Sequence, residues 1–274
     1  MVKKIGILLL LLVPVFVFSA DVSSDFKKNF NTNLQNRNIK NVDVDLQVIR
    51  KVDFMPNFYF SKLIIHDKNR KTDMSQYVLT DGRNLITEVV DIKTGNSVVK
   101  DMSFLENQSN IDTSMLSLVY GDRKSKNIIV EITDFECPYC KNAFNYIHTK
   151  IKDRKDVAVY IMNFPLDMHK NALIMAKIFE AGLKNGSNFA EDLFNGNYKN
   201  MDNNTLIDTF ARKTKYPVKF KELASSSEIS NRIRGHMNYA KTLGVNSTPI
   251  IYINGRQIRG FNKNMIDKAF DLFK

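Results

Sequence analysis

The sequence predicts an α/β protein of two domains: a small α+β domain, and a larger domain whose sheet is interrupted by a helical insertion. Three observations lead to this fold class. Cys137 and Cys140, the two cysteines of the chain, lie between an apolar run and a helical segment. The apolar run is nearly continuous, which is typical of a strand buried on both faces. An Asn-Gly hairpin turn at 254–255 follows a long series of helical patterns.

Residues 1–20 have the pattern of a signal peptide. A pair of lysines precedes an apolar stretch over residues 5–18, and small residues allow cleavage after Ser19 or Ala20. An uncleaved membrane anchor is the alternative, but a membrane-spanning helix needs about 20 apolar residues. We therefore expect cleavage and export, with the mature chain in the periplasm.

The composition indicates a globular protein, since 43% of the 274 residues are hydrophobic and 11% are aromatic. Loss of Lys3 and Lys4 with the signal peptide lowers the net charge from +11 to +9. A basic balance of this size is found in proteins that bind nucleic acid or anionic membranes. Here the basic residues are interspersed with acidic and amide residues along the whole chain and form no long block. We therefore predict no nucleic-acid partner.

Residues 21–98 are predicted to form the small α+β domain. Phe26 and Phe30 recur at the spacing of one helix face, and alternating apolar and polar residues follow, which is the pattern of a half-buried strand. Asp-Gly is a strong hairpin-turn signal. The expected elements are a helix over 22–40, strands over 42–48 and 58–65, and a hairpin over 76–90 with Asp81-Gly82 at its turn.

Residues 99–121 are predicted to form a helical linker, and residues 122–274 the catalytic domain, with a helical insertion at about 165–244. Pro217 and Gly244 are interpreted as breaks in the insertion. The expected elements are strands over 127–135, 157–164, 249–253 and 256–259, a helix from the cysteines to about 154, insertion helices over 168–184, 188–196, 202–213 and 226–243, and a closing helix over 262–273.

The cysteine spacing favours redox chemistry over metal binding. A structural zinc site needs four Cys or His ligands in two clusters, and the four histidines form no second cluster. We therefore predict no metal and no cofactor, and interpret His66, His148 and His236 as surface or packing residues. A purely structural disulfide is a further alternative, but so short a ring stabilises much less than the ~3 kcal/mol expected for a fifteen-residue loop. Cys-x-x-Cys between a strand and a helix instead indicates a thioredoxin-like redox motif.

Cys137 is the predicted nucleophile of this motif. A cysteine at a helix N-terminus meets unpaired backbone N–H groups and the positive end of the helix dipole, and both favour the thiolate. Pro138 suits the first helical turn, and Cys140, one turn further, is the predicted resolving thiol. We expect Pro138 and Tyr139 to contact the substrate.

Glu131 is the predicted proton acceptor for Cys140. It lies inside the apolar strand, six residues before Cys137. Burial would raise the pKa of its carboxyl toward neutrality, as a proton shuttle requires. The alternative is a strand-edge residue that points into solvent.

Thr248-Pro249 enters the predicted hairpin about a hundred residues after the cysteines. Together with Cys-Pro-Tyr-Cys, the run over residues 243–255 resembles the cis-proline loop of the bacterial Dsb disulfide oxidoreductases, a family with the thioredoxin-like fold. The resemblance implies that the bond before Pro249 is cis and that the backbone of Thr248 binds the substrate peptide. Residues 169–172, with the helices after them, resemble the inserted helical subdomain of the same family.

Residues 77–86 are similar to the end of the N-terminal dimerisation domain of the periplasmic disulfide isomerases DsbC and DsbG. This resemblance implies that residues 21–98 form a cystatin-like dimerisation domain and that the chain is a V-shaped homodimer. Threonine before the proline is similar to DsbG, whereas the oxidase DsbA typically has valine there. The insertion at 165–244 is closer to the oxidase type, and the chain lacks the additional structural cysteine pair of some relatives.

The expected function is thiol:disulfide interchange in the periplasm. In the leading hypothesis, Cys137 and Cys140 isomerise or reduce the disulfides of misoxidised exported proteins, and a DsbD-like membrane reductase keeps the pair reduced. The first alternative is a thiol oxidase of the same fold, which acts on unfolded exported proteins and is recharged by a DsbB-like membrane oxidase. The second is a dimeric periplasmic chaperone with secondary redox activity.

Overall fold

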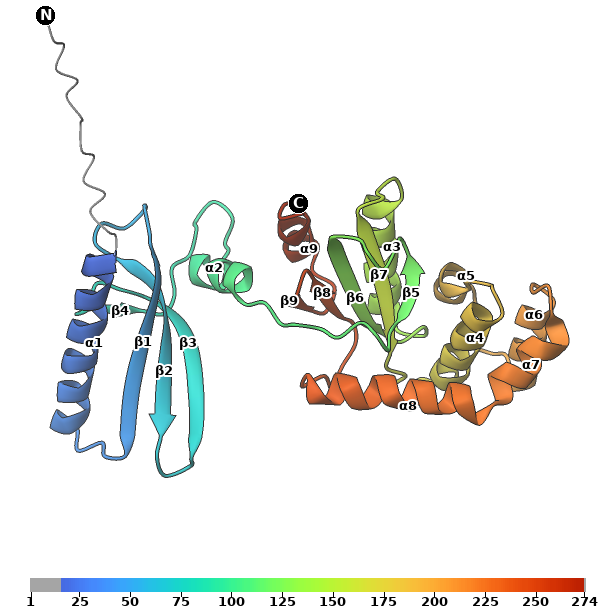
Figure 1. The fold of residues 1–274 in the computed structure, drawn as a ribbon, viewed down its shortest axis with the longest axis horizontal. Coiled ribbons are helices and arrows are strands. Elements are labelled where there is room, and N and C mark those ends of the chain that lie inside the picture. Colours follow the sequence, from blue (N-terminus) through green and yellow to red (C-terminus); the bar gives the residue numbers. More distant parts are fainter. Residues whose placement is uncertain (1–15, 274) are drawn as a thin grey trace, which may run out of the picture. The chain divides into compact units, whose positions relative to one another are not determined.

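The computed structural model describes residues 16–273, which divide into two compact units with the boundary after Glu106 (Figure 1). Most of the predicted signal peptide, residues 1–15, lies outside the described part. Helix α1 (Phe16–Asn36) begins directly after it, so both predicted cleavage positions lie within the first two turns of α1.

The first unit is a four-stranded antiparallel sheet covered on one face by α1. Phe26 of α1 packs against the alternate apolar residues that predict the first strand, such as Val44 and Leu46. Burial of these side chains on one face explains the period-two pattern. The strands, in sheet order, are β1 (Val42–Lys51), β2 (Tyr59–Asp67), β3 (Thr72–Thr80) and β4 (Leu85–Ile86).

The predicted hairpin around Asp81-Gly82 is present, but its second strand is only two residues long, with Leu79 opposite Ile86. The longer hairpin joins β2 to β3 and is missing from the sequence prediction. The first half of β3 is polar and exposed, so it shows no apolar alternation. Its turn is held by Asp67, whose side chain accepts hydrogen bonds from two following backbone N–H groups.

The prediction of a helical linker through residue 121 is wrong. Helix α2 (Val98–Glu106) ends at Glu106, and strand β5 (Ser117–Tyr120) is already an edge strand of the second sheet. Leu116 and Leu118 pack against that sheet. The apolar spacing that predicts a helix is therefore produced by an extended segment. Gly121 ends the strand at positive φ, where a Cβ atom would lie 1.9 Å from the carbonyl oxygen of Val157.

The second unit contains a five-stranded mixed sheet in the order β5-β7-β6-β8-β9. Strands β6 (Asn127–Thr133) and β7 (Val157–Asn163) are parallel and are connected by helix α3 (Pro138–Ile151). Strands β8 (Ile250–Ile253) and β9 (Arg256–Arg259) form the predicted antiparallel hairpin, and helix α9 (Lys263–Phe270) follows. Strands β6 to β9 and the closing helix lie within a few residues of their predicted positions, whereas β5 does not.

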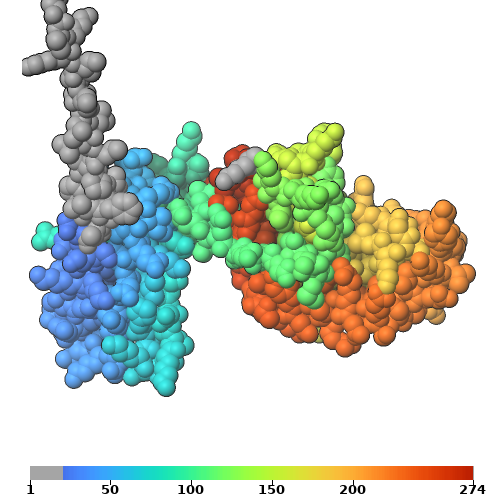
Figure 2. Space-filling view, viewed as in Figure 1, coloured from blue at the N-terminus to red at the C-terminus, as the bar shows by residue number. Residues whose placement is uncertain are grey.

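The helical insertion lies between β7 and β8 and forms a block beside the sheet, coloured yellow to orange in Figures 1 and 2. The sequence pattern predicts a break between helices at Pro217. In the structure Pro217 is instead the first residue of a helix, where its missing N–H costs no hydrogen bond. The insertion contains α4 (Ala172–Lys184), α5 (Ala190–Asn195), α6 (Asn203–Ala211), α7 (Pro217–Ser225) and α8 (Ser227–Thr242).

Candidate active site

The two cysteines lie where β6 ends and α3 begins. Cys137 occupies the N-cap position of α3, Pro138 follows as the first helical residue, and the backbone N–H of Cys137 donates to the carbonyl of Asp134. The side chain of Cys140 is completely buried, whereas Cys137 keeps about 5% of its surface exposed. Pro138 and Tyr139 are exposed beside it. One sulfur can therefore be reached from outside and the other cannot.

The surroundings of Cys137 stabilise its thiolate and lower its pKa to about 6. The hydrogen bond from the Cys140 thiol is the largest cause, and backbone N–H groups of the first helical turn add to it. The Thr248 side chain acts in the same direction, while burial of the sulfur opposes all of these contributions. Because the neutral range lies above pH 6, most Cys137 is ionised when the pair is reduced.

The surroundings of Cys140 have the opposite effect. Burial raises its pKa far above the ordinary value, and the neighbouring Cys137 thiolate raises it further. The hydroxyl of Thr133, at the end of β6, lowers the Cys140 pKa by a smaller amount. The reduced pair therefore holds one thiolate and one thiol, which is the charge distribution of an attacking and a resolving cysteine.

The loop before β8 reaches the cysteines. The Thr248–Pro249 peptide bond is cis, and the Cys137 Sγ atom lies 3.8 Å from the carbonyl oxygen of Thr248. The Pro249 carbonyl is turned the other way and accepts a hydrogen bond from the N–H of Gly260 in the following loop. Residues 111 positions apart in the sequence thus form the two sides of one site.

Glu131 lies in the middle of β6, with only 1% of its surface exposed, rather than at a solvent-facing strand edge. Burial raises the pKa of its carboxyl to about 8. Its Oε1 atom faces Nε2 of His148, on α3, at 3.7 Å. Glu131 and Thr133 point to the same face of β6, and residues at this spacing are about 7 Å apart along a strand. Glu131 is therefore the next residue on the same strand face as Thr133, whose side chain lowers the pKa of Cys140.

Asp134 was missed by the sequence prediction, although its buried carboxylate organises the loops around Cys137. One oxygen accepts from the N–H of Glu136, and the other accepts from the N–H of Leu166 and pairs with Nδ1 of His169 at 2.8 Å. Glu136 in turn accepts a hydrogen bond from the N–H of Asn171. The turn that carries Cys137 is thereby fixed to the start of the helical insertion.

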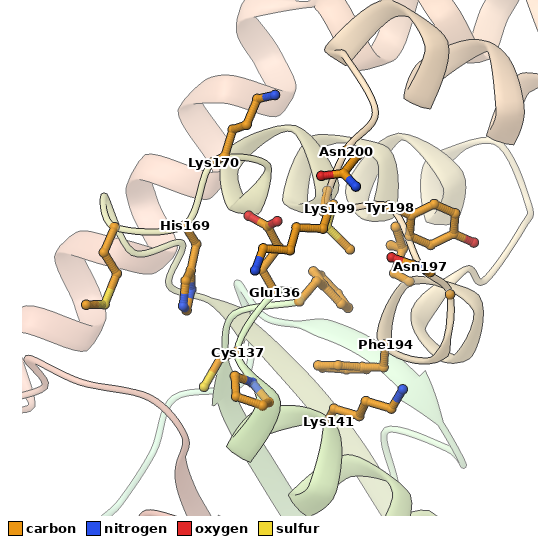
Figure 3. Close-up of a pocket in the computed structure, with 16 residues that line it drawn as sticks. Glu136, Cys137, Lys141, His169, Lys170, Phe194, Asn197, Tyr198, Lys199 and Asn200 are labelled. Carbon is orange, nitrogen blue, oxygen red and sulfur yellow. The ribbon is translucent and has the colours of Figure 1, made fainter.

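A pocket of about 690 Å³ opens beside Cys137, between α3 and the helical insertion (Figure 3). Phe135, Met175 and Phe194 form its apolar part, and the loop over 196–200 forms its far wall. Cys137 and Pro138 line one end of it, whereas Tyr139 is not a lining residue. An extended chain in this pocket would therefore run next to Cys137, the cysteine that keeps some surface exposed.

Comparison with known proteins agrees with this geometry. The family model described as Thioredoxin matches residues 113–271, which is more than half of the chain. This chain belongs to the thioredoxin family. The predicted thioredoxin-like α/β fold with a helical insertion is therefore confirmed.

Solved structures show the same fold at low sequence identity. A thioredoxin-like oxidoreductase from Silicibacter pomeroyi DSS-3 is 21% identical, with a TM-score of 0.52 over 60% of this chain and 96% of that chain. Oxidised BdbD from Bacillus subtilis is also 21% identical, with a TM-score of 0.52 over 60% of this chain and 95% of that chain. The matched part of this thioredoxin-family chain thus corresponds to nearly the whole of each of those proteins.

Curated relatives are of two kinds. The probable disulfide bond formation protein D of Bacillus anthracis is 25% identical over 192 residues, which are 65% of this chain and 83% of the relative. The Na(+)/H(+) antiporter NhaA 3 of Salinispora tropica is 28% identical over 144 residues, or 52% of this chain. The chain spans about a fifth (22%) of the length of that antiporter.

Across residues 16–273 we find no helix that is both long and apolar enough to cross a membrane. Residues 107–273 therefore combine the fold of the thioredoxin family with one reachable and one fully buried cysteine thiol.

Proposed function

We propose that this chain is an exported thiol oxidase, which transfers the Cys137–Cys140 disulfide to the thiols of unfolded exported proteins. Export rests on the signal-peptide pattern of residues 1–20. The name of the Bacillus anthracis relative, a probable disulfide bond formation protein, supports the oxidising direction.

The observation that carries this proposal is the stabilised Cys137 thiolate. A low thiolate pKa stabilises the reduced pair relative to the disulfide, so the disulfide becomes a stronger oxidant. Lowering the pKa of Cys137 from 9.0 to about 6 stabilises the reduced form at pH 7, because the thiolate is then its dominant state. The same thiolate is a good leaving group when the substrate disulfide forms.

The exchange has two steps. A substrate thiolate attacks Sγ of Cys137, breaking the Cys137–Cys140 bond, and the departing Cys140 sulfur takes a proton. A second substrate thiolate then attacks the substrate sulfur of the mixed disulfide and releases Cys137 as thiolate. The substrate is oxidised by two electrons, and the cysteine pair is reduced. We assign reoxidation of the pair to a DsbB-like membrane oxidase that accepts those two electrons.

Glu131 is the proposed proton donor to Cys140 in this direction and its proton acceptor in reverse. With a pKa of about 8, its buried carboxyl carries the proton at neutral pH. Thr133, whose side chain lowers the pKa of Cys140, is buried on the same strand face as Glu131. A buried thiolate without a proton source would be strongly destabilised, so this proton lowers the cost of the first step.

The second candidate is a homodimeric isomerase or reductase that acts on misoxidised exported proteins, with a DsbD-like membrane reductase as its partner. The extra first unit favours it, because the solved thioredoxin-like structures match only about 60% of this chain. In that unit the ten-residue strand β1 lies at the edge of the sheet, where a second copy could pair with it. A dimer of this kind would also suit a chaperone role.

Both candidates can be tested on one reduced and one misoxidised substrate protein. The oxidised chain should form disulfides in the reduced substrate at a rate well above that of the Cys137→Ser variant. The reduced chain should restore activity to the misoxidised substrate only slowly. Rapid restoration with little net oxidation would reject the oxidase and favour the isomerase, and inactivity in both assays would reject the function as a whole.

A further inference from the structure

We propose that the pocket beside Cys137 selects polypeptide segments that carry carboxylate side chains close to their reactive cysteine. This inference rests on the proposed thiol:disulfide exchange and adds a substrate preference to it. The occupant is an extended segment of the substrate protein, with one residue at Cys137 and acidic neighbours in the pocket.

Three lysines surround the pocket: Lys141 on α3, Lys170 just before α4, and Lys199 in the loop that forms the far wall. Figure 3 shows Lys199 extending across the pocket in front of Glu136, Lys141 beside Phe194, and Lys170 at the outer rim. Three separate elements of the fold thus place a lysine around one opening, and the side chain of Lys170 extends outward from its rim. Residues that lie far apart in the sequence, over 141–199, create this concentration of charge.

These ammonium groups are available to a ligand. Within residues 16–273, none of Lys141, Lys170 and Lys199 forms an ion pair, whereas several other lysines do, such as Lys150 with Asp267 at 2.7 Å. The carboxylate that lines the pocket belongs to Glu136, and its Oε2 atom already accepts the hydrogen bond from Asn171. The pocket is therefore left with an excess of positive charge.

His169, at the wall of the pocket, already pairs with a buried carboxylate. His169 lines the wall, but its Nδ1 atom is held by the carboxylate of Asp134, whose side chain is fully buried. This pair fixes the wall rather than offering a charge to the occupant. Carboxylates of a bound segment are thus the complementary partners of the three lysines.

The apolar part of the pocket explains why an unfolded segment would enter it. The rings of Phe135 and Phe194 lie 4.7 Å apart between centroids, tilted by 46°, and with Met175 they form an apolar floor. A volume of about 690 Å³ is in the range of pockets that enclose a drug-sized ligand, so it accommodates a few side chains. Apolar contact would provide affinity, while the lysines would choose among segments.

The test measures the first attack by Cys137 in the full-length Cys140→Ser variant, so that the mixed disulfide persists. The probes are three short peptides, each with one cysteine in a disulfide with 5-thio-2-nitrobenzoate, and with Glu, Gln or Lys at the flanking positions. Attack of the Cys137 thiolate forms the protein–peptide disulfide and releases the coloured thiolate. Rates with free glutathione correct for the intrinsic reactivity of each peptide.

We expect the Glu peptide to react about tenfold faster than the Gln peptide at low ionic strength, and the Lys peptide to react slowest. This ratio should fall as salt is added, because exposed charges are screened. Combining Lys141→Gln, Lys170→Gln and Lys199→Gln should reduce the Glu-to-Gln rate ratio to about one. The ratio is the readout because any change in Cys137 reactivity affects both peptides equally.

The matched control combines Lys124→Gln, Lys126→Gln and Lys155→Gln. These three lysines are exposed and lie near the first residues of β6 and β7, at the opposite end of these strands from the cysteines. Their substitution changes the net charge by the same amount as the pocket substitutions. The control should keep the Glu-to-Gln ratio. A ratio near one in the parent protein, or equal loss in both triple variants, would overturn the inference while leaving thiol exchange intact. If no peptide reacts at all, both the substrate preference and the proposed function fail.

Discussion

Oε1 of Glu131 and Nε2 of His148 lie 3.7 Å apart, and neither atom has a hydrogen-bond partner in the described part of the chain. The His148 ring is held in place between Phe144, at 3.8 Å between centroids, and the edge of Tyr120. Burial lowers the pKa of His148 to about 4 and raises that of Glu131 to about 8. At neutral pH the two groups therefore face each other as a neutral acid and a neutral imidazole.

The first prediction concerns the stability cost of Glu131. A carboxyl whose pKa rises from 4.5 to about 8 on folding destabilises the folded state progressively as the pH rises through this interval. Glu131→Gln cannot ionise, so it should be more stable than the parent protein by about 3 kcal/mol at pH 7. The measurement is the free energy of unfolding in urea at several pH values.

The pH dependence separates ionisation from packing. The difference between Glu131→Gln and the parent protein should be small at pH 4.5 and grow steadily toward pH 8, because His148 titrates in both proteins. A constant difference across this range would show that Glu131 is ionised in the folded state or exposed, and the proposed proton donor would be lost.

The second prediction concerns the ionisation of Cys137. Its alkylation by iodoacetamide should increase with pH, with a midpoint at about 6, in the Cys140→Ser variant, where serine keeps a hydroxyl near the sulfur. Thr248→Val should move the midpoint upward because the Thr248 side chain stabilises the thiolate. Thr242→Val, on an exposed threonine at the end of α8, is the control. Equal midpoints for Thr248→Val and the control would contradict the assigned role of Thr248.

The third prediction concerns the reduction potential. Each proton taken up on reduction lowers the potential of a two-electron couple by about 30 mV per pH unit. Below pH 6 both reduced cysteines are protonated, so the potential should fall by about 59 mV per unit. Above pH 6 only the buried Cys140 keeps its proton, and the slope should halve. Equilibration with glutathione at a series of pH values gives the slopes; one slope from pH 5 to 8 would contradict the Cys137 pKa.

The fourth prediction concerns a buried ionic network that fixes the helical insertion to the sheet. The Glu180 carboxylate accepts hydrogen bonds from Ser117 Oγ, Asn163 Nδ2 and, at 2.7 Å, Arg232 Nε. Arg232→Ala leaves this carboxylate buried without its cation and should cost about 2 kcal/mol, since Arg232 is partly exposed. Arg234→Ala, on the exposed side of the same helix, should cost much less. Similar losses in urea unfolding would show that the ion pair stabilises nothing.

Local patterns made the centre of the site predictable. The apolar run of β6, the cysteines and the start of α3 are consecutive in the sequence, so their geometry follows from strand and helix signals within a short window. The carboxyl of Glu131 interrupts that apolar run, a pattern that allows either burial or a solvent-facing strand edge, and the structure shows burial. Thr248 was placed at the site through its proline and the hairpin that follows.

The rest of the site depends on contacts that no local pattern encodes. Asp134 meets His169 across 35 residues, and His148 meets Glu131 only because α3 packs on β6. The sequence predicts a helix where β5 lies because four residues are too few to show alternation, and the pairing of β5 with β7 decides its conformation. Pro217 is compatible with a break or with the first position of a helix, and only the packing of α7 decides between the two.

The most direct test of the oxidase proposal is the redox state of Cys137 and Cys140 in living cells. Acid quenching followed by a thiol-specific mass tag, with the Cys137→Ser/Cys140→Ser double variant as the untagged reference, separates the two forms on a gel. A chain that donates disulfides should be found mostly oxidised at steady state, and it should become reduced when its membrane oxidase is absent. A chain that is mostly reduced in growing cells would contradict the proposal and favour the isomerase or reductase.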